Sequence, residues 1–469
     1  MQKSTKIVAT LGPASDDPHL LEQLLNAGVN TVRLNFSHGT AADHLARAAR
    51  VRELAERIGV AVAILADLQG PKIRIGKFEE QKVTLQGGER FILDANCKSG
   101  NATRVGLDYT DLPNDVRRGD RLLLDDGKIQ LVVDDVAGGE IHTTVLVGGE
   151  LSNNKGINRM GGGLSAPALT AKDMEDIKTC AALGADFVAV SFPKSDADIH
   201  MARTLLRAAG SHAAVIAKIE RCEAVDNLDN ILAASDGIMV ARGDLAVEVG
   251  DAAVPALQKR MIRAARRHHK LVITATQMME SMISSPVPTR AEVSDCANAV
   301  LDGTDAVMLS AESASGRYPL ESVQALARTC VEAERMQDDV LEHEFAGTGR
   351  LALPEQTMAM SAVYAARHLE LKAIITLAPD RASLLCLSRF TARVPVYAVT
   401  SCLQTYRHLA LHRNVFPVLL PATKACDALT EAKLQLQHRG RLSGGDMVAV
   451  LQCSPGSSRA DSLQLLRCA

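Results

Sequence analysis

Two charged residues end a segment that reads as a buried strand. Residues 214–220, AVIAKIE, are apolar until Lys218 and close on Glu220. Because side chains alternate between the two faces of a strand, Lys218 and Glu220 are expected side by side on one face. Burying both charges costs several kcal/mol unless a partner, a metal ion or a ligand compensates them. Taken alone, the spacing fits a structural ion pair as well as a functional site.

The segment DGIMVARGD, residues 236–244, could complete a metal site. Mg²⁺ prefers one or two carboxylates together with water and substrate oxygens, so Asp244 and Glu220 on adjacent strands would suit it. The backbone N–H groups of the turn at Gly243 could cradle an anion. Taken alone, Asp244 fits a helix N-cap better, with Arg242 as the ion partner of a neighbour.

The segment RLNFSHG, residues 33–39, offers groups that bind phosphate. Arg33, Asn35 and Ser37 share one face by the two-residue period of a strand. A guanidinium beside two short oxygen-bearing side chains fits phosphate or ion binding. His38 lies on the other face, where a structural role is as consistent as a functional one.

Other polar residues at the ends of apolar runs are ordinary when taken singly. Asp67, which is followed by Lys72 and Arg74, fits solvated charges at a domain junction. Thr274 and Thr276 are expected to point one way, but threonine is common in strands.

Short apolar runs of this kind alternate with amphipathic helical stretches. Strands alternating with helices indicate a parallel sheet, and near-continuous Val, Ile, Leu and Ala content indicates that both faces are covered. Eight such units predict an α/β fold, the (β/α)₈ or TIM barrel, whose active site lies at the carboxyl ends of the strands. The eight runs are TKIVATLGP, VNTVRLNFSHG, VAILADLQGP, DFVAVSFPK, AVIAKIE, DGIMVARGD, LVITATQM and DAVMLSAES.

Polar or charged residues close at least six of these eight runs, and Ser310 and Glu312 close the last. Polar residues placed by chance would rarely fall at the carboxyl ends of so many strands, which is where (β/α)₈ barrels have their active sites. The joint pattern therefore favours a functional site over separate structural ion pairs.

The barrel pattern is interrupted after the third run, where apolar and polar residues alternate. Asp126-Gly127 is a strong signal for a two-residue hairpin in this interval. Beyond the eighth run, the apolar segments AIITLAP, VPVYAVT, VFPVLL and MVAVLQ predict a separate α/β domain. The expected division is a barrel at 1–70 and 167–340, an inserted β-barrel lid domain at 71–166 and a C-terminal α/β regulatory domain at 345–469.

The composition argues against several classes of protein. A formal net charge of −3 offers no basic field for nucleic acid or an acidic membrane surface. Ten cysteines are scattered without metal-binding spacing, which is typical of reduced thiols in a cytosolic protein. No secretion signal and no apolar run long enough to cross a membrane is apparent. We therefore expect a cytoplasmic protein.

The motifs in this order resemble the pyruvate kinase family along nearly the whole chain. They are TKIVATLGPAS, VRLNFSHG, LQGPKIR, AKIE, MVARGDL, ITATQMMESM and PTRAEVSDCANAVLDGTDAVMLSAES. The resemblance implies the barrel, the lid and the C-terminal domain. It also implies transfer of a phosphoryl group from phosphoenolpyruvate to ADP, which gives pyruvate and ATP in glycolysis.

The resemblance also implies roles for individual residues. Glu220 and Asp244 would hold Mg²⁺ (or Mn²⁺), and Lys218 would stabilise the phosphoryl group in flight and the enolate left behind. Arg33 would bind the transferring phosphate. Thr276 would belong to the route that protonates the enolate through water.

Further positions would contact the substrates. The family's pattern implies that Gly243, Asp244, Thr276 and Ser191 contact phosphoenolpyruvate. It implies that ADP contacts Asn35, His38, Arg74 and Lys155. A homotetramer and a phosphorylated metabolite as effector are further expectations from the family.

One departure from the family concerns a monovalent cation. Many pyruvate kinases hold K⁺ at positions that match Asn35, Ser37, Asp67 and the Leu68 carbonyl, with a glutamate where this chain has Lys72. A lysine ammonium there would supply the charge and repel K⁺, so we expect catalysis that does not require K⁺. The segment DLQGPK matches the bacterial branch of the family with this lysine.

A second departure lies at Leu377–Leu385, LAPDRASLL, where relatives often carry a phosphate-binding loop. Pro379 removes an N–H group and Asp380 adds negative charge, leaving Arg381 and Ser383 as ligands in one possible register. Activation by a sugar phosphate in the family's usual manner is therefore not expected. A different effector site or weak regulation is the rival expectation.

Two other functions remain open at this point. A Mg²⁺-dependent barrel lyase or aldolase that acts through a pyruvate enolate would use Glu220 and Asp244 equally well, but it would not bind ADP. A non-catalytic metabolite sensor would have lost at least one of Lys218, Glu220, Asp244 and Thr276, and all four are present.

Overall fold

Eight parallel strands close into a barrel in the computed structural model, in the order β1-β16-β15-β14-β13-β12-β3-β2. The structure describes residues 3–336, 354–377, 381–390, 392–421, 425–454 and 460–468. The predicted barrel is confirmed, and each of the eight apolar runs contributes one strand. These strands are β1 (Lys6–Thr10), β2 (Thr31–Asn35), β3 (Ala63–Asp67), β12 (Phe187–Val190), β13 (Ala214–Ile219), β14 (Gly237–Ala241), β15 (Leu271–Ala275) and β16 (Ala306–Leu309).

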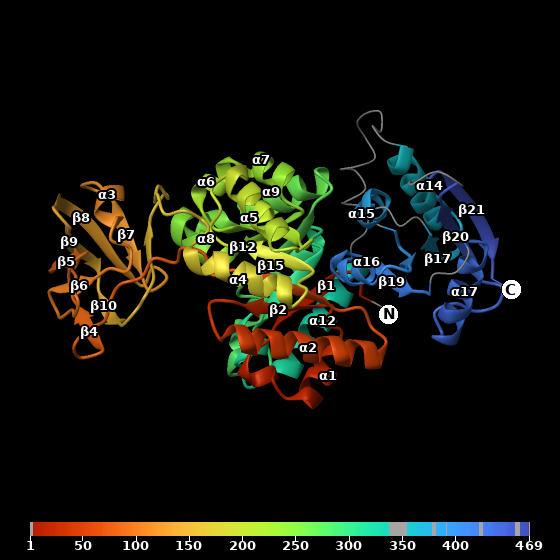
Figure 1. The fold of residues 1–469 in the computed structure, drawn as a ribbon, viewed down its shortest axis with the longest axis horizontal. Coiled ribbons are helices and arrows are strands. Elements are labelled where there is room, and N and C mark those ends of the chain that lie inside the picture. Colours follow the sequence, from red (N-terminus) through yellow and green to blue (C-terminus); the bar gives the residue numbers. More distant parts are fainter. Residues whose placement is uncertain are drawn as a thin grey trace.

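Helices surround the barrel (Figure 1). The helices that follow Thr40, Thr170 and Thr289 begin with a capping box: the threonine hydroxyl accepts an N–H group of the first turn, and an acidic side chain three positions later accepts the N–H group of the threonine. The helices are α1 (Pro18–Asn26), α2 (Ala41–Ile58), α4 (Ala171–Ala182), α5 (Asp196–Ala208), α6 (Cys222–Asp226), α7 (Leu228–Ala234), α8 (Arg242–Val249), α9 (Val254–Arg267), α10 (Arg290–Leu301), α11 (Ala311–Ala314) and α12 (Pro319–Arg335).

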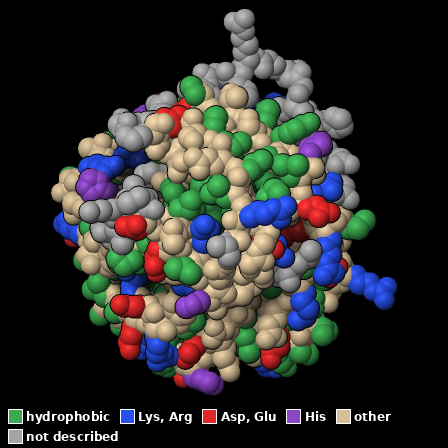
Figure 2. Space-filling model, turned by 90° about the vertical axis from the view of Figure 1, so that its right-hand side faces the viewer, with side chains coloured by type: hydrophobic (Ala, Val, Ile, Leu, Met, Phe, Trp, Pro, Cys, Tyr) green, Lys and Arg blue, Asp and Glu red, His purple; other side chains and the backbone are tan. Residues whose placement is uncertain are grey.

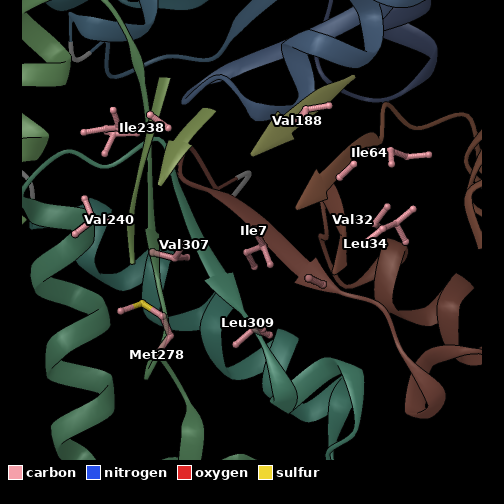
Figure 3. Close-up of a cluster of buried hydrophobic side chains, with 14 of the residues drawn as sticks. Ile7, Val32, Leu34, Ile64, Val188, Ile238, Val240, Met278, Val307 and Leu309 are labelled. Carbon is pink, nitrogen blue, oxygen red and sulfur yellow. The ribbon is translucent and has the colours of Figure 1, made fainter. Parts of the chain in front are cut away.

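The two faces of the barrel strands are buried in two separate layers. Ile7 and Ile64 belong to an outer cluster with helix residues, part of which Figure 3 shows. Val8 and Leu65, one position along, belong to the inner cluster that fills the barrel. This alternation puts Arg33 and Lys218 on the inward face, because the residues on either side of each belong to the outer cluster.

Strands between β3 and β12 form a separate unit to one side of the barrel (Figure 1). One sheet has the order β11-β7-β8-β9-β5-β6, and β10 pairs with β4 in another. The hairpin predicted at Asp126-Gly127 joins β7 to β8, but Leu124 pairs with Ile129, so its loop has four residues rather than two. The elements are β4 (Lys82–Leu85), β5 (Arg90–Asp94), β6 (Arg104–Gly106), α3 (Leu112–Asp115), β7 (Arg121–Leu124), β8 (Ile129–Ala137), β9 (Glu140–Val147), β10 (Gly149–Ser152) and β11 (Ile157–Arg159).

The C-terminal unit, at the opposite side of the barrel (Figure 1), is a five-stranded sheet in the order β19-β18-β17-β20-β21. Four strands match the predicted runs, whereas the antiparallel edge strand β21 has half-exposed residues and was not predicted from the sequence. Residues 378–380 of the predicted loop at Leu377–Leu385 lie outside the described residues. The elements are α14 (Pro354–His368), β17 (Leu371–Thr376), α15 (Arg381–Arg389), β18 (Val396–Thr400), α16 (Leu403–His408), β19 (Val415–Leu419), α17 (Ala425–His438), β20 (Met447–Gln452) and β21 (Ser462–Arg467).

The C-terminal unit closes the amino-terminal end of the barrel, which we call the foot. Leu385, Ala410 and Leu411 belong to the same buried cluster as the barrel interior. Arg389 Nη1 lies 2.8 and 2.9 Å from the two carboxylate oxygens of Asp305, and neither side chain is exposed. Both apolar packing and a buried ion pair, in which one guanidinium nitrogen contacts both carboxylate oxygens, therefore join the two units.

No helix in the part of the chain that the structure describes is long and apolar enough to cross a membrane.

Candidate active site

Four of the predicted residues meet at the carboxyl ends of the barrel strands, which we call the mouth. Lys218 Nζ lies 3.0 Å from Glu220 Oε1 and 3.4 Å from Asp67 Oδ1. Arg33 Nε donates a 2.6 Å hydrogen bond to Asp67 Oδ2. The side-by-side placement of Lys218 and Glu220 expected from the strand period is therefore present.

Backbone and hydroxyl groups fix this cluster. Lys218 Nζ donates to Ser191 Oγ at 2.8 Å, and Ser191 Oγ donates to the Leu68 carbonyl at 2.6 Å. The N–H of Phe192 donates to Glu220 Oε2 at 2.9 Å from a left-handed backbone with φ of 54°. Such strain in a non-glycine residue is typical of functional sites. Ser191, which only the resemblance indicated, thus contacts the lysine directly.

The electrostatics of the cluster leave one carboxylate short of positive charge. Burial alone would raise the pKa of Asp67, but Lys218 and Arg33 outweigh it and hold that pKa below its ordinary value. Burial opposes the charge of Lys218, yet Asp67 and Glu220 raise its pKa. The pKa of Glu220 is raised by burial and by the Asp244 and Asp67 carboxylates, which Lys218 offsets only in part. A further cation would therefore stabilise ionised Glu220.

Asp244 lies in the first turn of α8, directly after β14. Its carboxylate makes no N-cap bond there, so the N-cap interpretation is wrong. Arg242 does serve as an ion partner, to Asp295. Asp244 Oδ1 lies 3.3 Å from Lys72 Nζ. The negative charge of Asp244 also helps raise the pKa of Glu220, so a cation bound by both carboxylates would relieve their repulsion.

Thr276 and Thr274 do not share an environment, contrary to the prediction that they point one way. Thr274 Oγ1 bonds to Thr304 Oγ1 at 3.0 Å. The strand ends at Ala275, and Thr276 takes a left-handed backbone with φ of 67°. Its Oγ1 accepts a 3.0 Å hydrogen bond from the N–H of Gly243. The change of backbone conformation brings this hydroxyl to the turn that was expected to cradle an anion.

Lys72 is not where the sequence predicted its ammonium. We expected it among Asn35, Ser37, Asp67 and Leu68, but in the described residues it pairs with Asp244 and makes no ion pair with Asp67. Asn35 Oδ1 accepts from the N–H of Ser37 at 3.1 Å, and the Leu68 carbonyl accepts from Ser191. The segment that leaves the barrel after β3 turns the lysine toward the other carboxylate.

The predicted nucleotide contacts lie in two places. Asn35 ends β2 at the mouth, and His38 follows that strand with an exposed side chain. Arg74 Nη1 donates to the Asn154 carbonyl at 3.0 Å, and Lys155 Nζ lies 2.8 Å from Asp125 Oδ1. Arg74 and Lys155 therefore belong to the strand-rich unit and are not in contact with the Lys218 cluster.

A cleft of about 690 Å³ separates the mouth from that unit. Barrel residues on one wall and the β7–β8 hairpin on the other line the same space, so the hairpin faces the candidate site. Residues of the two walls include Gly243, Asp244, Thr276 and Glu312, and Leu123, Asp126 and Gln130.

Sequence reasoning missed two residues here. Thr10 Oγ1 accepts a 3.0 Å hydrogen bond from Arg33 Nη1, which helps orient that guanidinium. Glu248 is buried one helical turn after Asp244, and burial raises its pKa to about 7. The four-residue spacing from Asp244 was a usable signal for Glu248. Nothing distinguished Thr10 from other strand threonines.

Known proteins resemble this chain along its whole length. The family profiles described as "Pyruvate kinase, barrel domain" and "Pyruvate kinase, alpha/beta domain" match residues 2–323 and 356–466. A pyruvate kinase of Haemophilus influenzae is 50% identical over 472 residues, covering 99% of this chain and 98% of the relative. Pyruvate kinase II of Salmonella typhimurium is 52% identical over 458 residues, covering 96% and 95%. The crystal structure of a pyruvate kinase from Cryptosporidium parvum superposes with a TM-score of 0.94 at 32% identity, covering 100% and 97%.

Proposed function

Because the chain belongs to the pyruvate kinase family, whose members transfer a phosphoryl group from phosphoenolpyruvate to ADP, we propose that the charged mouth of the barrel carries out this transfer. The chain is a phosphotransferase, and nothing in the comparisons favours a lyase or a non-catalytic sensor. The observation that supports the proposal most strongly is the buried cluster of Lys218, Glu220, Asp67 and Arg33.

Pyruvate kinases generally use Mg²⁺, and two carboxylates of this chain fit it. In the described residues no group of three or more His, Cys, Asp or Glu could hold a metal by itself. Glu220 and Asp244 leave the remaining positions of the ion to water and substrate oxygens, which is how Mg²⁺ usually binds beside a phosphate. When bound, the ion would neutralise charge on the phosphoryl group and the substrate oxygens.

Lys218 and Arg33 supply the fixed positive charge for the transfer. The bond between the phosphoryl group and the enol oxygen breaks, while a bond to the terminal phosphate of ADP forms. Lys218, protonated because Asp67 and Glu220 raise its pKa, stabilises the phosphoryl group and then the enolate. Arg33, held by Asp67 and Thr10, binds the phosphate.

The turn after β14 receives the substrate carboxylate. The N–H groups of Gly243 and Asp244 and the hydroxyl of Thr276 form the acceptor for this group. Thr276 also belongs to the route by which water protonates the enolate carbon. Asn35, His38, Arg74 and Lys155 contact ADP, which requires the strand-rich unit to close as a lid over the mouth.

Lys72 replaces the monovalent cation that many relatives bind. Lys72 Nζ lies 3.3 Å from Asp244 Oδ1. With Mg²⁺ held by that carboxylate, repulsion between the two cations would favour turning the Lys72 side chain away from it. Asp67 and the Leu68 carbonyl then become its partners. Catalysis is therefore independent of K⁺.

The test is pyruvate formation from phosphoenolpyruvate and ADP with Mg²⁺ as the only inorganic cation, before and after adding K⁺. Full activity without K⁺ is expected. Lys72→Glu should make activity depend on K⁺, whereas Lys77→Glu, an exposed charge reversal in the same segment, should not. If the unchanged chain were active only with K⁺, the proposal that Lys72 replaces the monovalent cation would be wrong. No activity in either buffer would reopen the lyase and sensor readings.

The family further supports a homotetramer and a cytoplasmic location. A single species of four chains in sedimentation analysis is the expected result, and any smaller species at assay concentration would contradict it. The division into domains at 71, 166 and 345 is part of the same proposal.

A further inference from the structure

The segment after β13 carries the proposed metal ligand Glu220 and then meets the chain that returns from the strand-rich unit. Glu220 directly follows the strand, and Arg221 leads into α6. Residues 160–169, which we call the return linker, run from the end of β11 to the start of α4. Side chains of residues 221 and 223 bind this linker, so a movement of the strand-rich unit would reach the segment that holds Glu220.

Two side chains hold the return linker. Arg221 Nη1 donates to the Leu164 carbonyl at 3.3 Å, and Glu223 Oε1 accepts the N–H of Gly163 at 2.5 Å. Gly162 has a left-handed backbone with φ of 74°, and a Cβ there would lie 2.7 Å from Glu223 Oε2. The linker is therefore fitted closely to this carboxylate, and glycine allows the approach.

The same arginine contacts the residue that fixes Glu220. The Arg221 guanidinium carbon lies 5.4 Å from the centre of the Phe192 ring, within the range of a cation–π contact. Phe192 is the residue whose left-handed backbone donates its N–H to Glu220 Oε2 at 2.9 Å. Arg221 thus joins the return linker on one side to the support of Glu220 on the other.

A residue of α8 binds the same two segments. Glu248 Oε2 accepts the N–H of Cys222 at 3.0 Å, and the Glu248 carbonyl accepts the N–H of Gly161 at 3.1 Å. Because α8 also carries Asp244, the return linker is connected to the supports of both proposed metal ligands.

These charged residues are buried. Arg221 is 3% exposed and Glu248 is 4% exposed, whereas basic, acidic and apolar side chains are interspersed on the outer face of the C-terminal unit (Figure 2). Lys72 and Leu164, from the two chain segments that join the strand-rich unit to the barrel, line one small cavity with Arg221 and Asp244. A buried arginine is costly without compensation, and this one lies where both connections meet the metal site.

We propose that Arg221 and Glu223 are positioning residues, which set the orientation of Glu220 according to the place of the return linker. The inference rests on the proposed role of Glu220 in holding Mg²⁺. Partners that orient a metal ligand raise its affinity, because a ligand held in place loses less freedom when the ion binds. Linkage requires the reverse effect as well: a bound cation favours the linker position that suits Glu220, and with it one placement of the strand-rich unit.

The first experiment measures the dissociation constant of Mn²⁺, a paramagnetic substitute for Mg²⁺, by electron spin resonance on the full chain without substrates. Arg221→Gln should weaken Mn²⁺ binding by about tenfold. The sign is informative, because loss of a positive charge beside the site would by itself tighten the binding of a cation. Unchanged or tighter binding would refute the positioning role. Arg207→Gln, an exposed change on α5, is the matched control and should leave the affinity unchanged.

A pair of glycine variants tests the linker without changing any charge. Gly162→Ala pushes a methyl group against Glu223 and should also weaken Mn²⁺ binding. Gly161→Ala is the matched control, because its φ of 83° is equally left-handed but a Cβ there would meet nothing within 4 Å. It should bind Mn²⁺ as the unchanged chain does. Equal affinities in the two variants would mean that the place of the linker does not reach Glu220.

Glu220→Gln separates this inference from the proposed function. If Glu220→Gln bound Mn²⁺ as tightly as the unchanged chain, the proposed role of Glu220 as a metal ligand would itself be wrong. If Glu220→Gln lost affinity while Arg221→Gln and Gly162→Ala kept it, only the positioning role would be wrong. Thermal unfolding of each variant completes the test: a lower melting temperature with an unchanged dissociation constant would mean a structural contact only. If Arg221→Gln does not fold, the two glycine variants decide the outcome.

Discussion

The two ends of the barrel both bury ionic groups, but they satisfy them differently. At the foot, Asp305 is closed by protein groups, since Arg389 binds both oxygens and the N–H of Val272 donates to one of them at 2.9 Å. At the mouth, Lys218 serves two carboxylates at once, and Glu220 keeps a raised pKa. The Asp305 carboxylate at the foot is therefore compensated by protein groups alone, whereas the proposed Mg²⁺ and substrates would supply the remaining positive charge at the mouth.

This difference shows why burial alone does not identify a site. The Arg389–Asp305 pair is 0% exposed and joins two units, and its charges need no ligand because the two residues compensate each other. A cluster in which one cation is divided between carboxylates, next to residues with strained backbone, is arranged for a ligand. The predictions below test this contrast by breaking each end in turn.

Lys218→Met should have the largest effect of these changes, and it should lower the catalytic rate without preventing folding. Removing the charge that faces the phosphoryl group and the enolate should lower kcat by about 10²–10³-fold or more. Steady-state rates of pyruvate formation measure this. Lys178→Met, which removes an exposed lysine on α4, is the matched control and should be neutral. A loss smaller than tenfold in Lys218→Met would place the essential charge elsewhere.

Arg389→Met should affect stability and spare catalysis. It strands the Asp305 carboxylate in a buried interface, which costs about 3–5 kcal/mol of unfolding free energy. Denaturant unfolding at one pH measures the loss, while kcat and KM of the protein that remains folded should stay within twofold.

The second change Asp305→Asn in the Arg389→Met background separates charge from packing. Neutralising the stranded carboxylate should restore part of the lost free energy. If Arg389→Met lowered kcat at unchanged stability, the foot would be coupled to the chemistry and the contrast between the two ends would fail.

Glu248→Gln should have the smallest effect and show it as a pH dependence. Burial, only partly offset by the Cys222 N–H and Arg221, raises the pKa of Glu248 from 4.5 to about 7 in the folded protein. The folded state therefore holds the proton more tightly than the unfolded state. Ionisation costs stability progressively as pH rises from about 4.5 to 7, and the cost is constant above that range.

The glutamine variant lacks this cost, so its stability relative to the unchanged chain should improve by about 1–3 kcal/mol between pH 5 and pH 8. Unfolding free energies at several pH values measure the difference. Glu332→Gln, a change on the surface of α12, should show no such trend. A flat difference for Glu248→Gln would mean that water reaches this carboxylate freely.

Local sequence rules predicted most of the barrel and part of the site. Strands covered on both faces must be apolar throughout, so the eight runs were visible, and the two-residue period placed Lys218 beside Glu220. The same period failed at Thr276, because the backbone leaves the strand at Ala275. A local pattern cannot report a change of backbone conformation at its own end.

Contacts between distant segments were beyond sequence reasoning. Arg389 and Asp305 are 84 positions apart, and Lys72 and Asp244 are 172 apart. Their pairing depends on how the units dock and on where the chain turns after β3. The four-residue hairpin loop at Asp126 and the half-exposed strand β21 were misjudged or missed because neither has a strong periodic signal.

The packing of Leu385, Ala410 and Leu411 against the barrel interior also limits how this chain can recombine with its relatives. A crossover placed between the barrel and the C-terminal unit would combine the barrel of one parent with the C-terminal residues of another parent that pack against it. Hybrid genes should therefore yield folded protein only when these three positions and Arg389 travel together with the barrel residues that they meet. In this respect the two units are inherited as one.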